Sequence, residues 1–319
     1  MTNDVIAGRL TQTGALIQES VRQWVIGALP YNRTNPAAVA HLCRLCAHQL
    51  LVLYHNWMNR AVRPLPRQVR RSKAFLQNPI VSQRAADLAR VAADIECGNN
   101  LRKYLSRDIK VAFTPALAGP RSRVRKDLDL MLNDWGVHHL HISTTLDADG
   151  YVVRKRSVLP EPLLFAVFKP HSAFLIDIMQ HGDWYLDHVL EILASEWPDE
   201  GIIHRLNRQN PEPNLTAEGR KAVRNQHANS QFSHEGRVYM PAGILSSAGT
   251  TFAAVHEADK LLAQGEAFEH YLGNDSDWIN SPDEPRFQFD MQNEGYVFTA
   301  TKRRLCGKRV VKSQGWWLV

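Results

Sequence analysis

The hydrophobic period of the chain changes near residue 124, and this change constrains the fold more than any other feature. Before it, apolar residues recur every three or four positions, most clearly over 35–60, which predicts helices. After it come short strand-like runs, separated by turn signals such as Asp149-Gly150. We expect these strands at 137–144, 151–158, 163–168 and 173–181, between helices at 124–134 and 187–197. This stretch therefore predicts a compact α+β unit.

Composition divides the rest of the chain. Pro115, Gly119 and Pro120 indicate a linker, and 204–235 is rich in Asn, Gln and Arg with few aliphatic residues. A helix over 252–271 lies among strand-like runs near the C-terminus. We expect an α+β fold with a helical N-terminal domain at 1–118, a central small antiparallel sheet flanked by helices at 119–200, a polar connector at 201–235 and a C-terminal α+β module at 236–319.

The formal charge of +6 and the pI of about 9.2 favour an anionic partner. The excess is concentrated in three basic runs, which is the electrostatic pattern of phosphate contact. A polyanion, with RNA or DNA first, is therefore the expected partner, and solvated surface faces are the alternative. The residues expected to contact nucleic acid are Arg67, Arg70, Arg71, Arg123, Arg125, Lys302, Arg303, Arg304, Lys308 and Arg309.

The sequence carries no sign of secretion or membrane insertion. Four cysteines in 319 residues are too few for a disulfide framework. The N-terminus lacks the basic segment and apolar core of a signal peptide. No apolar run approaches the roughly 20 residues of a membrane span. We therefore expect a cytoplasmic protein without a membrane partner.

The densest group of reactive side chains lies at 135–143, where three histidines fall within four residues. On a strand, the period of two places His139 and His141 on one face. Leu140 and Ile142 mark the other face as the core side, so we expect the two imidazoles to be accessible together. Neighbouring imidazoles near pH 7 exchange protons or bind a metal. The alternative is a pair of surface histidines without a role.

The strand that ends at His181 repeats this pattern, with Asp177 on the same face. Between the two strands, Arg154 and Arg156 share one face of a hairpin. A metal-independent ribonuclease needs a base for the 2′-hydroxyl, cations for the phosphorane and an acid for the leaving oxygen. If the strands are neighbours, the catalytic candidates that supply these parts without a cofactor are His139, His141, Arg154, Arg156 and His181.

The order of these elements resembles a known family. A helix, Trp135-Gly-Val-His-His-Leu140, an Arg-bearing strand pair, two apolar strands and a closing helix are similar in layout to the RelE/HigB-type toxins. The resemblance covers about 124–198. It implies a metal-independent endoribonuclease, RNA cleavage on an exposed sheet face, and a protein inhibitor as a possible partner. Those toxins are usually small single-domain proteins, and their basic C-terminal segment does not follow the closing helix here.

Two other functions use the same residues. A metal-dependent hydrolase would bind zinc or another divalent metal through His139, His141, Asp177 and His181, although nearby arginines repel a cation. A non-catalytic nucleic-acid-binding or regulatory protein would use the arginines to position phosphates. Cleavage that depends on the histidines separates the first expectation from the last.

Two further motifs favour structural roles. Cys43-x-x-Cys46 lies on a predicted helix without a second such pair, so packed thiols are expected. The small-residue turn 243–251 precedes a helix, where amides can bind an anion. An ordinary helix cap at Thr250 or Thr251 explains this turn equally well.

Overall fold

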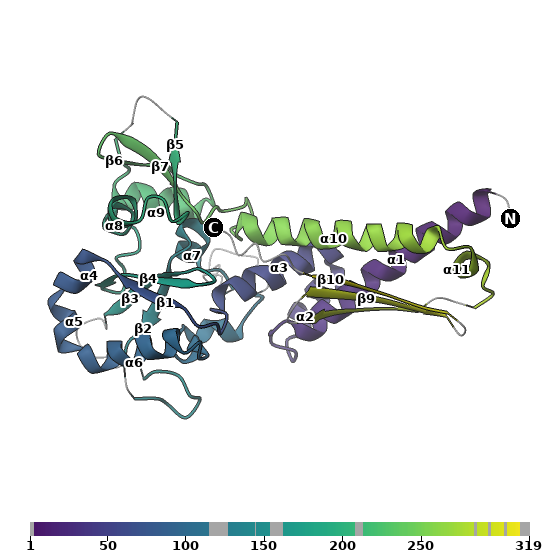
Figure 1. Ribbon diagram of the computed structural model, residues 1–319, viewed down its shortest axis with the longest axis horizontal. Helices are drawn as coiled ribbons and strands as arrows, with labels where there is room; N and C mark the ends of the chain where they lie inside the picture. Colours follow the sequence, from purple (N-terminus) through teal and green to yellow (C-terminus); the bar gives the residue numbers. More distant parts are fainter. Residues whose placement is uncertain are drawn as a thin grey trace. The chain divides into compact units, whose positions relative to one another are not determined.

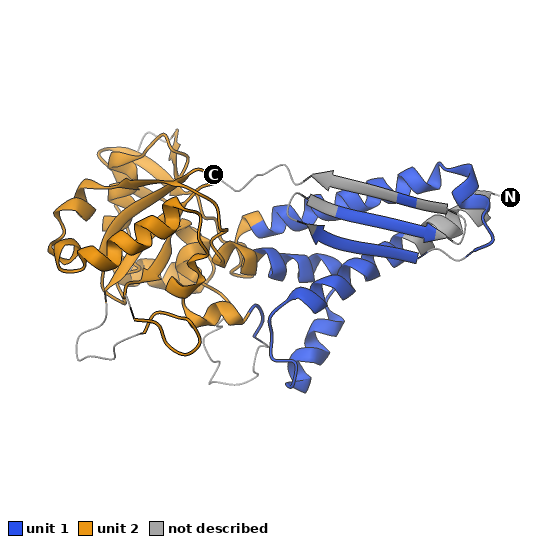
Figure 2. Ribbon diagram, turned by 60° about the horizontal axis from the view of Figure 1, so that its bottom comes forward, with its two compact units in different colours: residues 1–55, 112–123, 254–316 blue, residues 56–111, 124–253, 317–319 orange. Residues whose placement is uncertain are grey.

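The chain folds as an α+β protein, as its sequence predicts, and it divides into two compact units (Figures 1 and 2). Unit 1 comprises residues 1–55, 112–123 and 254–316, and unit 2 comprises 56–111, 124–253 and 317–319. The computed structural model describes residues 3–114, 127–143, 145–153, 162–207, 213–283, 286–292, 295–302 and 305–312. Side chains are described within these ranges except at 3–13, 292, 295–296, 302, 305–306 and 308–312.

The two units differ from the four consecutive segments expected from the sequence. The predicted N-terminal helical domain is divided: 1–55 belongs with the C-terminal module, whereas 56–111 belongs with the central sheet. The physical reason is a long-range strand pairing. Residues Gln68–Arg71 form a strand, β1, that pairs in parallel with β4 (Ser172–Met179). Such a pairing leaves no local signal in the sequence.

Unit 1 combines long helices with an antiparallel sheet of order β10-β9-β8 (Figure 1). Its described elements are α1 (Asn3–Ala28), α2 (Pro36–Arg44), the first part of α3 (Ala47–Arg60), most of α10 (Phe252–Gly273), α11 (Ser276–Asn280), β8 (Arg286–Gln292), β9 (Gly295–Lys302) and β10 (Leu305–Lys312). Helix α1 lies against β8, where the Trp24 indole donates to Asp290 at 2.9 Å.

The helix expected over 35–60 is two helices, because the backbone at Leu45 is extended with ψ of 143°. The Gln49 side chain accepts from the Cys46 N–H at 3.1 Å and supports the start of the second helix. Within the described residues, no single helix has the length and apolarity to span a membrane. The α2–α3 pair, bent by 119°, meets that test only when its two helices are taken together.

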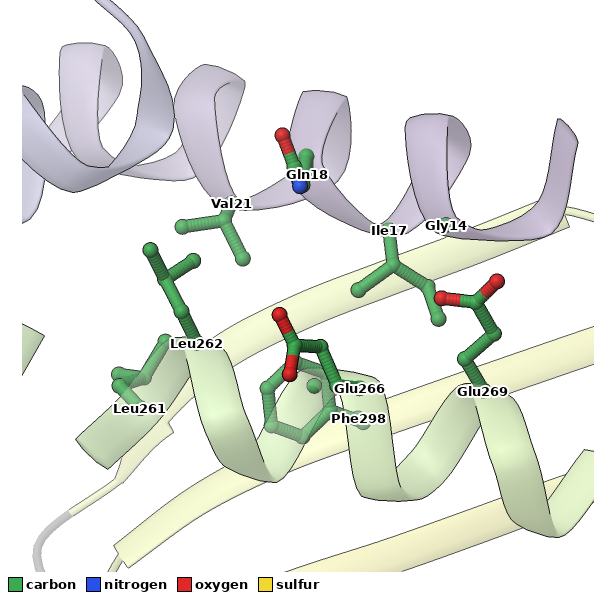
Figure 3. Close-up of a pocket in the computed structure, with 10 residues that line it drawn as sticks. Gly14, Ile17, Gln18, Val21, Leu261, Leu262, Glu266, Glu269 and Phe298 are labelled. Atoms are coloured by element: carbon green, nitrogen blue, oxygen red, sulfur yellow. The ribbon is translucent and has the colours of Figure 1, made fainter. Parts of the chain in front are cut away.

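A small gap separates α1 from α10 in unit 1 (Figure 3). Its volume is about 50 Å³, and apolar side chains such as Ile17 and Phe298 line it together with Glu269. A methyl group at Gly14 would stand 2.5 Å from the Glu269 carboxylate, so the missing side chain makes room for this carboxylate. Burial raises the pKa of Glu269, as does the neighbouring Glu266.

Unit 2 holds the other two sheets, of order β1-β4-β3-β2 and β5-β7-β6. Besides β1, β4 and the end of α3, its described elements are α4 (Lys73–Gln77), α5 (Pro79–Gln83), α6 (Ala85–Glu96), the 3₁₀ turns Leu101–Tyr104 and Arg107–Lys110, α7 (Leu130–Trp135), β2 (His138–His141), β3 (Leu163–Phe168), α8 (His188–Glu196), β5 (Ile203–Leu206), α9 (Ala217–Asn225), β6 (Phe232–His234) and β7 (Arg237–Pro241).

The four-stranded sheet is covered on both faces, with α6 on one side and α8 on the other (Figure 1). Phe165, Phe174 and Ile176 pack toward α8, whereas Leu164 and Leu175 pack toward α6. Strands buried on both faces are continuous apolar runs, as β3 and β4 are. A register shift after Phe165 places Asp177 opposite Phe165 and Leu175 opposite Ala166.

Helix ends and one turn lie where glycines in the sequence predict them. Gly98, just beyond α6, and Gly136, the cap of α7, have positive φ, as expected for helix C-terminal glycines. Gly150 also has a positive φ in the predicted Asp149-Gly150 turn. These glycines are needed because other residues are strained at such dihedral angles.

The segment expected as a polar connector, 201–235, is folded into unit 2. It contributes β5, α9 and β6, and α9 buries Arg220 and Arg224 almost completely. The expectation of a connector is wrong because polar composition was taken as solvent exposure. Two arginines one helical turn apart form instead the buried side of α9.

Candidate functional site

Two of the three predicted catalytic histidines contact one indole, that of Trp184. The ring centroids of His139 and His181 lie 4.9 and 4.5 Å from Trp184, both in edge-on contact. His141 lies next to His139, with 6.3 Å between their ring centroids. Strand β2 supplies His139 and His141, and the chain beyond β4 supplies His181. Strands β2 and β4 are not direct neighbours, because β3 lies between them in the sheet.

The expectation that His139 and His141 lie on an open sheet face is wrong. His141 is only 5% exposed, and the side chain of His139 is 14% exposed. Trp184 covers Phe165, the residue opposite His139 on β3, with 6.5 Å between ring centroids. Alternation along β2 was taken to separate core from solvent, but this sheet has a core on each face. Neither imidazole is positioned to meet a large substrate directly.

His138 lies on the opposite side of β2 and is buried as well, at 9% exposure. Its Nε2 lies 3.2 Å from the Asn59 carbonyl oxygen, and its ring meets Phe168 edge-on. Burial lowers the pKa of His138 to about 4, so this imidazole is neutral near pH 7. It is a core side chain that has lost its charge.

The accessible imidazoles lie on the segment from Gln180 to His188, here called the strap. The strap begins with a tight turn, in which the Gln180 N–H donates to Asp183 at 2.8 Å. Gly182 follows with φ of 118°, which favours glycine. His181 and His188 are exposed, and Trp184 between them is half-buried against the core. The reactive surface of this region is therefore the strap.

Alternation along the strand had predicted that Asp177 shares a face with His181. In the structure, Asp177 pairs with His188. Strand β4 ends at Met179 and the chain then turns, so the period of two does not extend to His181. His188 Nε2 lies 3.0 Å from Asp177 Oδ2, and the imidazole is 46% exposed. The Asn78 amide donates to Asp177 Oδ1 at 2.7 Å and fixes the carboxylate from the other side.

The pair shifts both protonation equilibria. The hydrogen bond to Asp177 raises the pKa of His188 and outweighs the burial of the ring. Burial raises the pKa of Asp177, but the hydrogen bonds from His188, Asn78 and the Ile178 N–H lower it below its usual value overall. A carboxylate that holds a half-exposed imidazolium is an arrangement suited to proton donation.

Two of the three arginines predicted to bind nucleic acid at 67–71 bind other parts of unit 2. Arg67 is 7% exposed and donates to the carbonyl oxygens of Lys169, Arg63 and Leu65 at 2.6, 2.9 and 3.0 Å. The expectation that Arg67 contacts nucleic acid is therefore wrong. Arg70 forms an ion pair with Glu200. Arg71 is exposed, as a phosphate contact requires.

The side chains of the other predicted cationic residues are not among those that the structure describes. Arg154 and Arg156 lie outside the described residues, as do Arg123, Arg125, Arg303 and Arg304. Lys302, Lys308 and Arg309 belong to β9 and β10, but their side chains are not described. The structure therefore shows the imidazoles and the carboxylate of the site, whereas the roles of Arg154 and Arg156 stay predictions.

The predicted metal ligands do not meet. Asp177 is engaged by His188 and Asn78, while His139 and His181 contact Trp184. Within the described ranges, no three His, Cys, Asp or Glu side chains are arranged to hold a metal ion. The thiols of Cys43 and Cys46 are exposed and unbridged, so the expectation that they are packed is wrong.

The turn at 243–251 uses its amides internally. The Thr251 N–H donates to Asn56 at 3.1 Å, and the Phe252 N–H donates to the Ile244 carbonyl at 2.7 Å. These amides, which precede α10, are not available for the anion that the sequence suggested. Gly243 instead allows a close approach to α7, because a methyl group there would lie 2.4 Å from the Gly136 nitrogen.

Sequence reasoning missed His188, Asn78 and the α9 arginines. His188 carried one signal: it lies in the first turn of the predicted closing helix, which follows the Asp177 strand directly. Arg220 and Arg224 carried another, because a spacing of four residues places two side chains on the same face of any helix that forms there. No protein-family model matches this chain, and neither a curated protein nor a solved structure matches it.

Proposed function

We propose that this protein is a metal-independent endoribonuclease whose accessible acid–base groups are His181 and His188 on the strap. The observation that carries the proposal is the Asp177–His188 pair, whose imidazole lies on the same strap as a second exposed imidazole, that of His181 against Trp184. The positive charge of the chain favours a polyanionic substrate. The layout resemblance to RelE/HigB-type toxins agrees with this assignment of activity.

The two imidazoles take different roles. His188 is the general acid, because its hydrogen bond to Asp177 raises its pKa and favours the protonated form. His181 is the general base, which takes the proton of the ribose 2′-hydroxyl. The 2′-oxygen then bonds to phosphorus, the bond from phosphorus to the 5′-oxygen breaks, and His188 protonates that oxygen. The products are a 2′,3′-cyclic phosphate and a 5′-hydroxyl end.

His139 and His141 have a supporting role in this proposal. They lie behind Trp184 and are nearly buried, and His139 Nδ1 is 3.6 Å from Asp129 Oδ2. Their contacts fix the indole, and the indole positions His181. The exposed Arg71 and the undescribed Arg154 and Arg156 are the proposed phosphate contacts. RNA is the proposed substrate because the reaction requires the 2′-hydroxyl.

The test is incubation of the purified protein with labelled single-stranded RNA, with and without EDTA. The variants are His181→Ala and His188→Ala, and the control is His204→Ala, an exposed histidine on β5 of the same unit. We expect cleavage that survives EDTA, leaves a cyclic phosphate and falls by about 10²-fold or more in each strap variant. The His204→Ala control retains wild-type cleavage.

Other outcomes would overturn the proposal in distinct ways. Cleavage abolished by EDTA would transfer the assignment to a metal-dependent hydrolase. RNA binding at low salt without cleavage in any sample would indicate a non-catalytic binding protein. Equal cleavage of an RNA with a 2′-deoxy residue at the scissile position would exclude attack by the 2′-oxygen.

A further inference from the structure

Helix α9 holds the strap through several contacts. Arg224 donates from NH1 to the Trp184 carbonyl oxygen at 2.7 Å, and its guanidinium lies 4.9 Å from the Tyr185 ring centroid. Arg220 forms an ion pair with Asp187, the residue before His188. Lys221, exposed on the same helix, lies 5.8 Å from the Tyr185 ring centroid. One short helix thus contacts three positions of the strap, 184, 185 and 187.

The main contact is fixed on its other side by α7. Arg224 is 1% exposed and lies between two aromatic rings, with its carbon 4.3 Å from the Trp135 ring centroid. Its Nε donates to Asp134 Oδ2 at 2.7 Å. Both Asp134 and Trp135 end α7, and Trp135 is fully buried. The guanidinium therefore links α7 to the strap through opposite sides of one planar group.

We propose that α9 positions the strap, and that Arg224 and Arg220 are positioning residues for the imidazoles on either side of Trp184 and Tyr185. Their catalytic consequence rests on the proposed ribonuclease function, whereas the hold on the strap does not. Removing the Arg224 contact leaves the Trp184 carbonyl oxygen without this donor, so the part of the strap that leads into α8 is less constrained. His188 is then held less closely to Asp177, and His181 loses its fixed contact with the indole.

Lysine cannot replace Arg224 in this role. A guanidinium is planar and offers donors in a fixed fork, so it reaches the Asp134 carboxylate and the Trp184 carbonyl while it stacks on two rings. An ammonium group keeps the charge but lacks the plane and the fork. Arg224→Lys therefore separates the positioning role from the simple presence of a cation. Arg237→Lys, at an exposed arginine on β7, is the matched control.

The experiment combines hydrogen exchange over 180–188 with NMR titration of His188 in the full-length protein. In Arg224→Lys we expect strap amides to exchange about tenfold faster or more, while the amides of β3 and β4 stay protected. The His188 pKa moves back toward about 6.5, the value of an unpaired imidazole. Tyr185→Leu, which keeps the ion pair with Asp134 intact, changes both readouts in the same direction. Arg237→Lys leaves them unchanged.

The outcomes distinguish this inference from the proposed function. Strap exchange and His188 titration identical to the wild type in both Arg224→Lys and Tyr185→Leu would overturn the inference, even if RNA is cleaved. A looser strap in a protein whose wild type does not cleave RNA would support the hold of α9 and overturn the ribonuclease. If the wild type cleaves, the looser strap lowers kcat more than it raises KM, because misplaced acid–base groups act in the chemical step.

Discussion

Strand β2 and helix α9 both bury polar side chains in unit 2, but by opposite physical routes. His138 on β2 is buried as a neutral imidazole, because burial lowers its pKa to about 4. Arg224 on α9 is buried as a cation, with Asp134 as its counter-ion and two aromatic rings beside it. An imidazole can release its proton when solvent is removed, whereas a guanidinium cannot. A buried arginine therefore needs a carboxylate, and a buried histidine does not.

This difference shows how each region depends on its surroundings. His138 needs only apolar neighbours and a hydrogen-bond acceptor, so its contribution to stability varies with pH. The α9 arginines need specific partners on α7 and on the strap, so their environment depends on geometry. His188 differs from both, because it is half-exposed and its hydrogen bond to Asp177 raises its pKa. Substitution and pH therefore affect the three groups differently.

The largest effect is expected from removing the buried cation. Arg224→Met leaves Asp134, 2% exposed, without its counter-ion, and an unpaired buried charge costs about 3–5 kcal/mol of unfolding free energy. Urea unfolding of unit 2 measures this loss. Asp134→Leu on the same background removes the stranded carboxylate and should recover part of the stability. If the double variant is no more stable than Arg224→Met, packing on Trp135 is the dominant contribution of Arg224.

The buried neutral imidazole predicts a dependence of stability on acid. The unfolded chain takes up the His138 proton near pH 6.5, whereas the folded chain does so only near 4. Between these values the unfolded state binds more protons, so stability falls as pH falls. At about 1.4 kcal/mol for each pKa unit, the full loss is about 3 to 4 kcal/mol.

The check is Tm measured from pH 7 down to pH 4 for the wild type and His138→Gln. The glutamine amide can still donate to the Asn59 carbonyl but takes up no proton, so we expect a shallower fall in Tm. His55 in unit 1, whose pKa burial also lowers to about 4, contributes a slope that remains. A parallel pair of curves would show that His138 is charged or solvated in the folded protein. His204→Gln, at an exposed position, should leave the slope unchanged.

Sequence reasoning succeeded where one local signal determines the structure. Apolar periodicity located α8 and strands β2 to β4, and single glycines located the ends of α6 and α7. The convergence of His139 and His181 also followed, because turns between consecutive strands bring their ends together. In these cases the interactions that decide the structure lie within about ten residues or between neighbouring strands.

It failed where a distant partner decides the environment. The run containing Arg67 and Arg70 looks like a phosphate-binding surface, yet β1 pairs with β4 and these arginines bind Lys169 and Glu200. The exposure of His141 depends on the strap and α8, which cover a face that alternation alone assigned to solvent. Arg224 in α9 is buried because α7 offers a carboxylate and an indole 90 residues away. No local pattern encodes these partners.

A smaller effect is expected at the half-exposed pair. In Asp177→Asn the His188 pKa should fall, because the hydrogen bond and the charge of Asp177 that raise it are removed while the desolvation of the ring remains. NMR titration of the imidazole measures this value, and Asp199→Asn at an exposed site is the control. A His188 pKa that stays raised in Asp177→Asn would mean that Glu191, on the same helix, holds the proton.

The same pair affects stability in a defined pH window. Because the His188 pKa is raised, its contribution is complete below about pH 6.5 and is lost as pH rises through the raised value. Because the Asp177 pKa is lowered, its contribution is present above about pH 4 and is lost as pH falls through the lowered value. The contribution is therefore greatest in weak acid, where His138 has begun to destabilise the fold.

The smallest effect is expected in unit 1. There the carboxylate of Glu269, like the imidazole of His138 in unit 2, has a pKa that burial shifts. The Glu269 pKa is raised by burial against α1 and by Glu266, so the folded state disfavours the charge that the side chain carries at pH 7. Glu269→Gln keeps an acceptor for the Gly14 N–H and removes that charge. It should stabilise unit 1 by less than about 1 kcal/mol, because the side chain is partly exposed and solvent screens it.

The sign of this last effect depends on pH, and this dependence makes the test specific. The raised pKa means that stability falls as pH rises through the pKa of the unfolded chain, so the gain from Glu269→Gln appears above about pH 4 and disappears below it. Thermal unfolding at pH 7 and pH 4 measures both ends. Glu266→Gln, at the exposed neighbour, removes only the repulsion and should give a smaller gain. A loss of stability in Glu269→Gln at pH 7 would mean that the ionised carboxylate is held by its contact with Gly14, as the carboxylate of Asp134 is held by Arg224.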